Sequence, residues 1–207
     1  MESVLGDMAL QVEASTALVL RLCHAFDRAP VDGGEAAYMR LLTPAVKYWI
    51  CKSAPAFLFE AMECIGGNGY VEEGILARHY REAPVNAIWE GSGNVMCLDV
   101  LRALARDAEA AYGVLKQLAA QAEGLPGAAE AVAFIAGALR RPDAERGARF
   151  AVERLALLAA AAALNAVHSP HAALFAQTRL AQPHGTMYGA VDLDPDAMRG
   201  LLARALP

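Results

Sequence analysis

Residues 61–94 read AMECIGGNGYVEEGILARHYREAPVNAIWEGSGN, and this stretch carries the signals that decide the fold. Gly66-Gly67-Asn68-Gly69 interrupts a long helical pattern, because glycine adopts the backbone conformations that end a helix. One helical turn is predicted at 75–81, and Pro84 is expected to stop it and leave 85–89 extended. Ser92 then offers an N-cap for a new helix.

Long helices are predicted on both sides of this stretch. Apolar residues recur at helical spacing over 2–28, and a second helical segment covers 35–65. Thr43-Pro44 is expected to divide that segment into a short and a long helix, and Pro55 to kink the long one. A third long helix is predicted over 93–123. Four aromatic side chains are expected in the core of this bundle: Tyr48, Trp49, Phe57 and Phe59.

Gly124-Leu125-Pro126-Gly127 has the composition of a linker. The sequence therefore predicts an all-α protein in two parts, a helical bundle over 1–123 and an additional helical region over 128–207. The bundle is expected to be up-down and incomplete, since antiparallel bundles are commonly built from four helices and only three long ones are predicted. Further helices are predicted in the second part at 128–140, 143–168, 170–181 and 195–205.

Composition and charge exclude several classes of protein. The chain has 207 residues, is 56 % hydrophobic and carries a net charge of −5, which does not suit a strongly basic nucleic-acid-binding protein. Its longest apolar run covers only 155–164, whereas a membrane span needs roughly 20 residues, so no membrane segment is expected. The N-terminus shows no basic leader, and the spacing of the four cysteines favours a reducing, cytoplasmic location. No metal site is expected at the cysteines or at His168 and His171, which a predicted helix break separates.

Glu90 is the candidate for acid–base chemistry. It follows Ile88 and Trp89, and burial against the indole would dehydrate the carboxylate and increase its affinity for a proton, which suits a general base. The other interpretation is that Glu90 is an acid at a helix start, where the dipole of the helix after Ser92 stabilises the charged form. The catalytic interpretation predicts a dry carboxylate close to the glycine turn at 66–69.

The GGNGY and RHYREAPV segments, followed by IWEGSGNVMCLDVLRAL at 88–104, closely resemble the C-terminal helical domain of the FAD-dependent acyl-CoA dehydrogenases. The resemblance is strongest to the DNA-alkylation-response branch, which is similar to isovaleryl-CoA dehydrogenase. It covers about residues 1–106, and 107–207 are similar to the extra C-terminal helical region of that branch.

This resemblance implies a set of functional residues. Glu90 would remove the α-proton of an acyl-CoA substrate while a hydride passes to FAD. Gly66 and Gly67 would contact the FAD of a neighbouring subunit, and Ser92 and Asn94 would also contact FAD.

The resemblance also implies that parts of the enzyme are absent from this chain. In the family, an N-terminal helical domain, a middle β domain and the first bundle helix precede this region. We therefore expect the chain to be the C-terminal half of such an enzyme, as a truncated product, a split subunit or a fragment. Alone, it is expected to be inactive and to bind no FAD tightly. Its expected partners are a second copy of itself or the missing N-terminal half.

The alternative is a non-catalytic helical association module or DNA-binding module, since the resembling branch is linked to duplex DNA. Arg140, Arg141, Arg146 and Arg149 form the local basic excess that would contact phosphates. The same arginines are also compatible with a solvated helix face that holds pairs such as Glu145–Arg149.

Overall fold

A computed structural model describes residues 1–182 and 194–205, and these residues are helical almost throughout with no strand among them. The predicted all-α fold is confirmed. The elements are α1 (Glu2–Arg28), α2 (Gly33–Cys64), α3 (Gly67–Tyr70), α4 (Ile75–Asn86), α5 (Gly93–Arg106), α6 (Ala108–Gln121), α7 (Ala128–Leu139), α8 (Ala144–Ala166), α9 (Ala172–Ala176), the π-helix η1 (Gln177–Ala181) and α10 (Pro195–Ala205).

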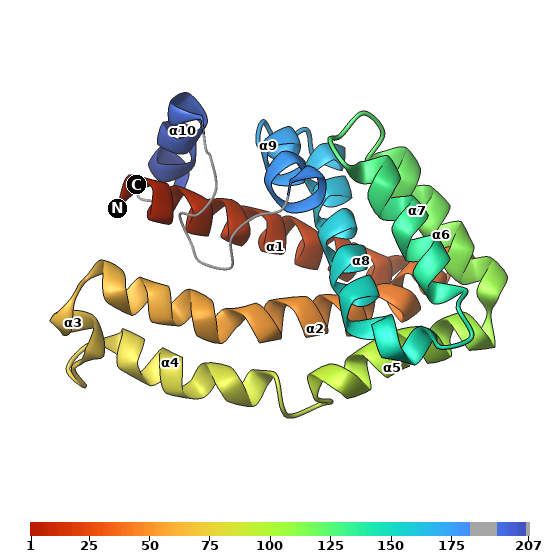
Figure 1. Ribbon diagram of the computed structural model, residues 1–207, viewed down its shortest axis with the longest axis horizontal. Coiled ribbons are helices and arrows are strands. Elements are labelled where there is room, and N and C mark those ends of the chain that lie inside the picture. Colours follow the sequence, from red (N-terminus) through yellow and green to blue (C-terminus); the bar gives the residue numbers. More distant parts are fainter. Residues whose placement is uncertain (183–193, 206–207) are drawn as a thin grey trace.

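Helices α1 and α2 run antiparallel, and α4 and α5 run back along the other side of α2 (Figure 1). α2 is one continuous helix, so the predicted break at Thr43-Pro44 is wrong. The carboxylate of Asp32 caps its start by accepting two backbone N–H bonds, at 2.8 and 3.2 Å. The Thr43 hydroxyl donates to the carbonyl of Met39 at 2.6 Å, a bond made within a helix and not at its start. Packing against α1, α4, α5 and α8 offsets the backbone bonds that the two internal prolines remove.

The prediction of a short turn followed by an extended segment at 85–89 is also wrong. α4 continues to Asn86 with Pro84 in its last turns, and residues 87–90 form turns, in which the Trp89 N–H donates to the carbonyl of Val85 at 3.0 Å. The predicted helix over 93–123 is two helices, because the Asp107 carboxylate accepts the N–H of Ala110 at 3.0 Å and starts α6.

The two predicted parts share one hydrophobic core. α8 lies at its centre, where residues 155–164 are all buried and the helix contacts α1, α2, α5, α6 and α7. The segment predicted as a linker is packed against the chain: Gly127 has a φ of +72°, and a Cβ there would overlap the backbone of Ala181. The segment 124–127 thus divides the sequence into two regions, but the hydrophobic core of the described residues is continuous across it.

The last helices depart from the prediction at one point. The predicted helix at 170–181 consists of α9 followed by the π-helix η1. Ser169 precedes this segment, and its hydroxyl donates to Glu13 at 2.8 Å. α10 begins as expected, with the Asp194 carboxylate accepting N–H bonds from Asp196 and Ala197 at 3.1 and 3.0 Å.

α1 is long and apolar enough, by length and composition alone, to cross a bilayer. Its buried face, however, carries Asp7 and Gln11, and it packs against α2, α8 and α10. We therefore interpret α1 as a core helix.

Candidate active site

The loop that joins α4 to α5 holds Glu90 in an unusual backbone conformation. Glu90 has a φ of +55° and Gly91 a φ of +116°. Side chains rarely adopt a φ of +116°, so the backbone at Gly91 favours glycine, which also leaves room for the methyl group of Met96. A glutamate in the left-handed region is disfavoured by contact between its Cβ and the backbone, and it persists only where the surroundings fix it.

Two cations from distant parts of the chain contact this loop and the start of α5 that follows it. The Lys47 ammonium on α2 donates to the carbonyls of Trp89, at 2.8 Å, and Gly91, which flank Glu90. Arg149 on α8 donates to the Asn94 side-chain oxygen at 3.1 Å and to the Tyr48 hydroxyl at 3.3 Å. Burial raises the pKa of Tyr48 and the bond from Arg149 opposes this, so the hydroxyl stays protonated near neutral pH.

The expected dry environment of Glu90 is wrong for the described part of the chain. Glu90 is exposed, and the side chains of Ile88 and Trp89 are 65 % and 60 % exposed. The tight turns at 87–90 present these apolar residues outward, so the indole does not shield the carboxylate. Ser92 and Asn94 are exposed beside Glu90, and Ser92 occupies the N-cap position of α5 without a side-chain capping bond.

The glycine turn at 66–69 and Glu90 lie at opposite ends of α4. Gly66 and Gly67 precede α4 and Glu90 follows it, and the 12 residues of α4 separate the two groups by about 18 Å. The expectation of proximity is wrong because α4 is a continuous helix and not a single turn. The candidate residues therefore form two clusters, one at each end of α4.

Exposed large apolar side chains gather around both clusters. We call these exposed side chains together the apolar face; exposed apolar surface beyond scattered single residues commonly marks an interaction site. Phe59 belongs to it, at 48 % exposed and with its ring 6.0 Å from that of Tyr80, so the prediction that Phe59 lies in the core is wrong, whereas Tyr48 and Trp49 are buried as predicted. Its residues are Phe59, Ile65, Tyr70, Val71, Ile75, Tyr80, Val85, Ile88, Trp89 and Val95.

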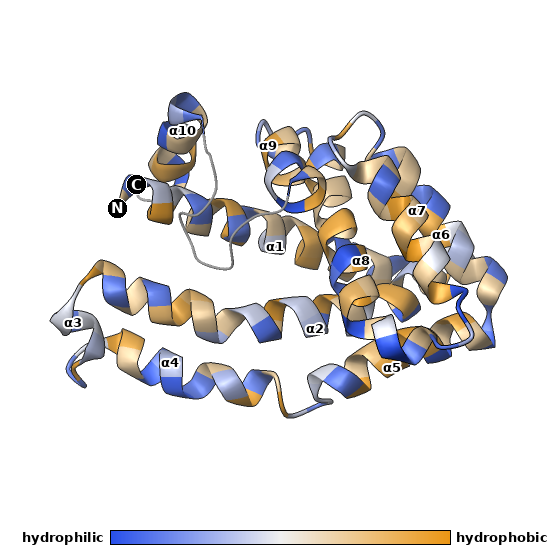
Figure 2. Cartoon of the chain, viewed as in Figure 1, coloured by the Kyte–Doolittle hydropathy of each residue, from blue (hydrophilic) through white to orange (hydrophobic). Residues whose placement is uncertain are grey.

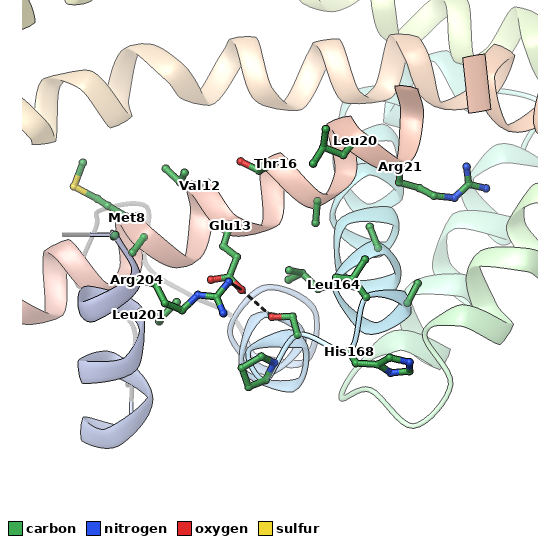
Figure 3. A pocket seen from close by; sticks show the side chains of 18 of the residues that line it. Met8, Val12, Glu13, Thr16, Leu20, Arg21, Leu164, His168, Leu201 and Arg204 are labelled. Carbon is green, nitrogen blue, oxygen red and sulfur yellow. Dashed lines mark hydrogen bonds and ion pairs between the residues drawn. The ribbon is translucent and has the colours of Figure 1, made fainter. Parts of the chain in front are cut away.

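An apolar groove of about 920 Å³ runs along α1, bordered by Phe57 of α2, the end of α8 and α10. Met8, Val12, Thr16 and Leu20 line it along α1, and at one edge Glu13 accepts from Ser169 and pairs with Arg204 at 3.2 Å (Figure 3). Hydrophobic residues recur along α1 and α2 toward the ends that diverge, and none of the helices in residues 1–182 and 194–205 lies between them there (Figure 2). An uncovered apolar groove is what the predicted incomplete bundle would leave.

Residues 1–105 match the family model for the acyl-CoA dehydrogenase C-terminal domain, which is about half of the chain. The chain belongs to the acyl-CoA dehydrogenase family. The putative acyl-CoA dehydrogenase AidB of Escherichia coli is 42 % identical over 206 residues, covering 99 % of this chain and 37 % of AidB. Acyl-CoA dehydrogenase family member 11 of Caenorhabditis elegans is 43 % identical over 97 residues, which are 47 % of this chain and 15 % of that protein.

A solved structure has the same helical architecture. Caenorhabditis elegans ACDH-11, crystallised in complex with C11-CoA, superposes with a TM-score of 0.73 over 94 % of this chain and 37 % of that protein, at 22 % identity. This likeness confirms the fold of the dehydrogenase C-terminal helical domain. The chain thus spans little more than a third of the length of AidB and ACDH-11. Because the similarity to AidB extends over 206 residues, it includes the region beyond the family domain.

The glycine turn of this dehydrogenase domain fits close approach by a cofactor. Gly66 has a φ of +64°, and no atom lies within 4 Å of a Cβ built at Gly66 or Gly67, so their backbone is open. Gly69 has a packing role, because a Cβ there would overlap the backbone of Met62. Glu63 is exposed nearby, and its negative charge would repel a diphosphate.

Three of the four arginines predicted for DNA are held by their own chain. Arg140 donates to the Tyr112 hydroxyl at 3.2 Å, Arg141 pairs with Asp143 through bonds of 2.9 and 3.2 Å, and Arg149 donates to the Asn94 side chain at the start of α5. Arg146 is exposed. His168 and His171 take part in no group of metal-ligating side chains within residues 1–182 and 194–205.

Proposed function

We propose that this chain is the C-terminal module of a flavin-dependent acyl-CoA dehydrogenase and that Glu90 is its catalytic base. The observation that carries the proposal is the backbone of Glu90, which is left-handed and fixed on both sides by one lysine at the edge of an exposed apolar face. Strained, over-determined residues gather at active sites. The apolar face is the surface that other parts of the enzyme would cover, and covering it would supply the dehydration that Glu90 lacks here.

In the proposed reaction, the Glu90 carboxylate accepts the α-proton of the acyl-CoA thioester, and its backbone N–H donates to the thioester oxygen. FAD, when bound, would accept the hydride from the β-carbon, which leaves a carbon–carbon double bond in the substrate. Ser92 and Asn94 would hold the cofactor near the base. Gly66 and Gly67, at the far end of α4, would contact the cofactor of a neighbouring subunit.

The chain alone is expected to purify without flavin absorbance and without dehydrogenase activity, because it offers only part of the cofactor site. Mixing it with the N-terminal and β-domain portion of an AidB-like dehydrogenase should produce a stable flavin spectrum and acyl-CoA oxidation. Gly66→Val should weaken flavin retention in this mixture, since a β-branched residue is strained at φ +64°. Flavin retained by the isolated wild-type chain would contradict this account.

The uncovered surfaces predict self-association of the isolated chain. In light scattering, the 21.9 kDa chain should behave as a dimer or larger species, because burial of the α1 groove removes apolar surface from water. Leu20→Glu, which places a charge in the groove, should shift the population toward monomer. Phe150→Glu, at an exposed site away from the groove, is the matched control. A wild-type chain that stays monomeric at all concentrations would refute the prediction.

The DNA-binding alternative has less support, since Arg140, Arg141 and Arg149 already contact side chains of their own chain. For either function we propose a cytoplasmic location, which the four free thiols favour.

A further inference from the structure

We propose that Lys47 and Arg149 are positioning residues for the loop that carries Glu90. Lys47 fixes the backbone on both sides of the base, and Arg149 attaches the start of α5 to α8. This inference rests on the proposed role of Glu90. It adds that residues beyond the family domain at 1–105 take part in building the site.

Lys47 acts on the backbone of the loop. Its ammonium donates to the Trp89 carbonyl at 2.8 Å and also to the Gly91 carbonyl, so the carbonyls of the two residues that flank Glu90 both point toward this lysine of α2. Charge-assisted bonds of this kind are stronger than bonds between neutral groups. They hold Glu90 in a conformation that its side chain disfavours, at a φ of +55°.

Arg149 acts at the next turn of the chain. Its guanidinium bridges the Tyr48 hydroxyl of α2 and the Asn94 side chain at the start of α5. The Tyr48 ring in turn packs against Gly93, where a Cβ would lie only 3.3 Å from a ring carbon. Three helices that are distant in sequence, α2, α5 and α8, therefore meet at the end of the Glu90 loop.

These contacts are placed to orient the loop and add little to the core. Lys47 is half-buried, and Arg149, Asn94 and Glu90 are exposed. Lys52 lies on the same helix near Gly93 but is exposed, and it provides a control of equal charge. Arg146, one turn before Arg149 and also exposed, provides the second control. Proton abstraction needs a base in a defined position, and contacts of this kind hold the backbone of the base in place.

The first test measures the loop itself in the 207-residue chain. With Trp49→Phe as background, Trp89 is the remaining tryptophan of the two in the sequence, and its emission and anisotropy report on the loop. Lys47→Met should increase amide hydrogen exchange over 87–94 by about tenfold and lower the Trp89 anisotropy. Lys47→Arg should restore most of the protection, and Lys52→Met should change neither readout.

Arg149→Met should increase exchange at 93–96, and Arg146→Met should not.

The second test uses the flavin-containing mixture described above. Lys47→Met should lower kcat by about tenfold or more with little change in KM, and Lys47→Arg should recover it. Unchanged loop exchange in Lys47→Met and Arg149→Met would overturn the inference, as would faster exchange with an unchanged kcat. If the wild-type mixture shows no dehydrogenation, the proposed function fails. The exchange data then decide by themselves whether the two cations hold the loop.

Discussion

Replacing Arg179 with methionine is expected to reduce the free energy of unfolding by about 3–5 kcal/mol. Arg179 lies in the π-helix η1 and pairs with Asp7 of α1, and their side chains are 5 % and 3 % exposed. Removing the guanidinium takes a charged partner away from a buried carboxylate, which costs more than the loss of a surface ion pair. A urea or guanidinium titration should show the loss as a lower midpoint at similar slope.

Two further variants make this prediction specific. Arg199→Met removes an exposed pair with Asp196, so its effect should stay below about 1 kcal/mol. The double variant Asp7→Asn with Arg179→Met should recover part of the loss, since neither buried charge remains. Equal effects of Arg179→Met and Arg199→Met would show that the buried pair does not anchor the C-terminal region.

The region around this pair shows how the described residues of the second predicted part share a core with the first. Arg154 of α8 donates to the carbonyls of Arg179 and Leu180, each at 2.8 Å, at the end of η1. Burial lowers the pKa of Arg154, yet it remains charged at neutral pH. With Gly127 packed against Ala181, these contacts attach η1 to α1, to α8 and to the start of α7.

Local signals in the sequence predicted the helix boundaries that depend on local chemistry. The glycine turn ends α2 and Ser92 precedes α5, as expected. The prolines misled the prediction, because each removes one backbone bond while the packing of α2 and α4 supplies many contacts. The break before α6 was missed although Asp107 is a good N-cap residue, since apolar periodicity continues across it.

The site was predictable only in part. The sequence motif identified Glu90 and the glycine turn, but the exposure of Glu90 depends on which surfaces cover the loop, and spacing carries no such information. Lys47 was missed because it lies 42 residues before Trp89, and only the folded chain brings them together. Arg149 was assigned to a DNA surface for the same reason: its bond to Asn94 spans 55 residues.

Replacing Glu90 with glutamine is expected to slow removal of the substrate α-proton by about 10²–10⁴-fold, the usual contribution of a general base. Glutamine has nearly the same shape, so the contacts of the loop with Lys47 should persist while the proton acceptor is lost. Glu82→Gln, at an exposed carboxylate on α4, is the matched control and should have no effect.

The most direct measurement is solvent deuterium exchange into the α-position of an acyl-CoA in the flavin-containing mixture. The account predicts exchange with the wild-type chain and with Glu82→Gln, and almost none with Glu90→Gln. Undiminished exchange with Glu90→Gln would contradict the central claim, because another group would then be the base.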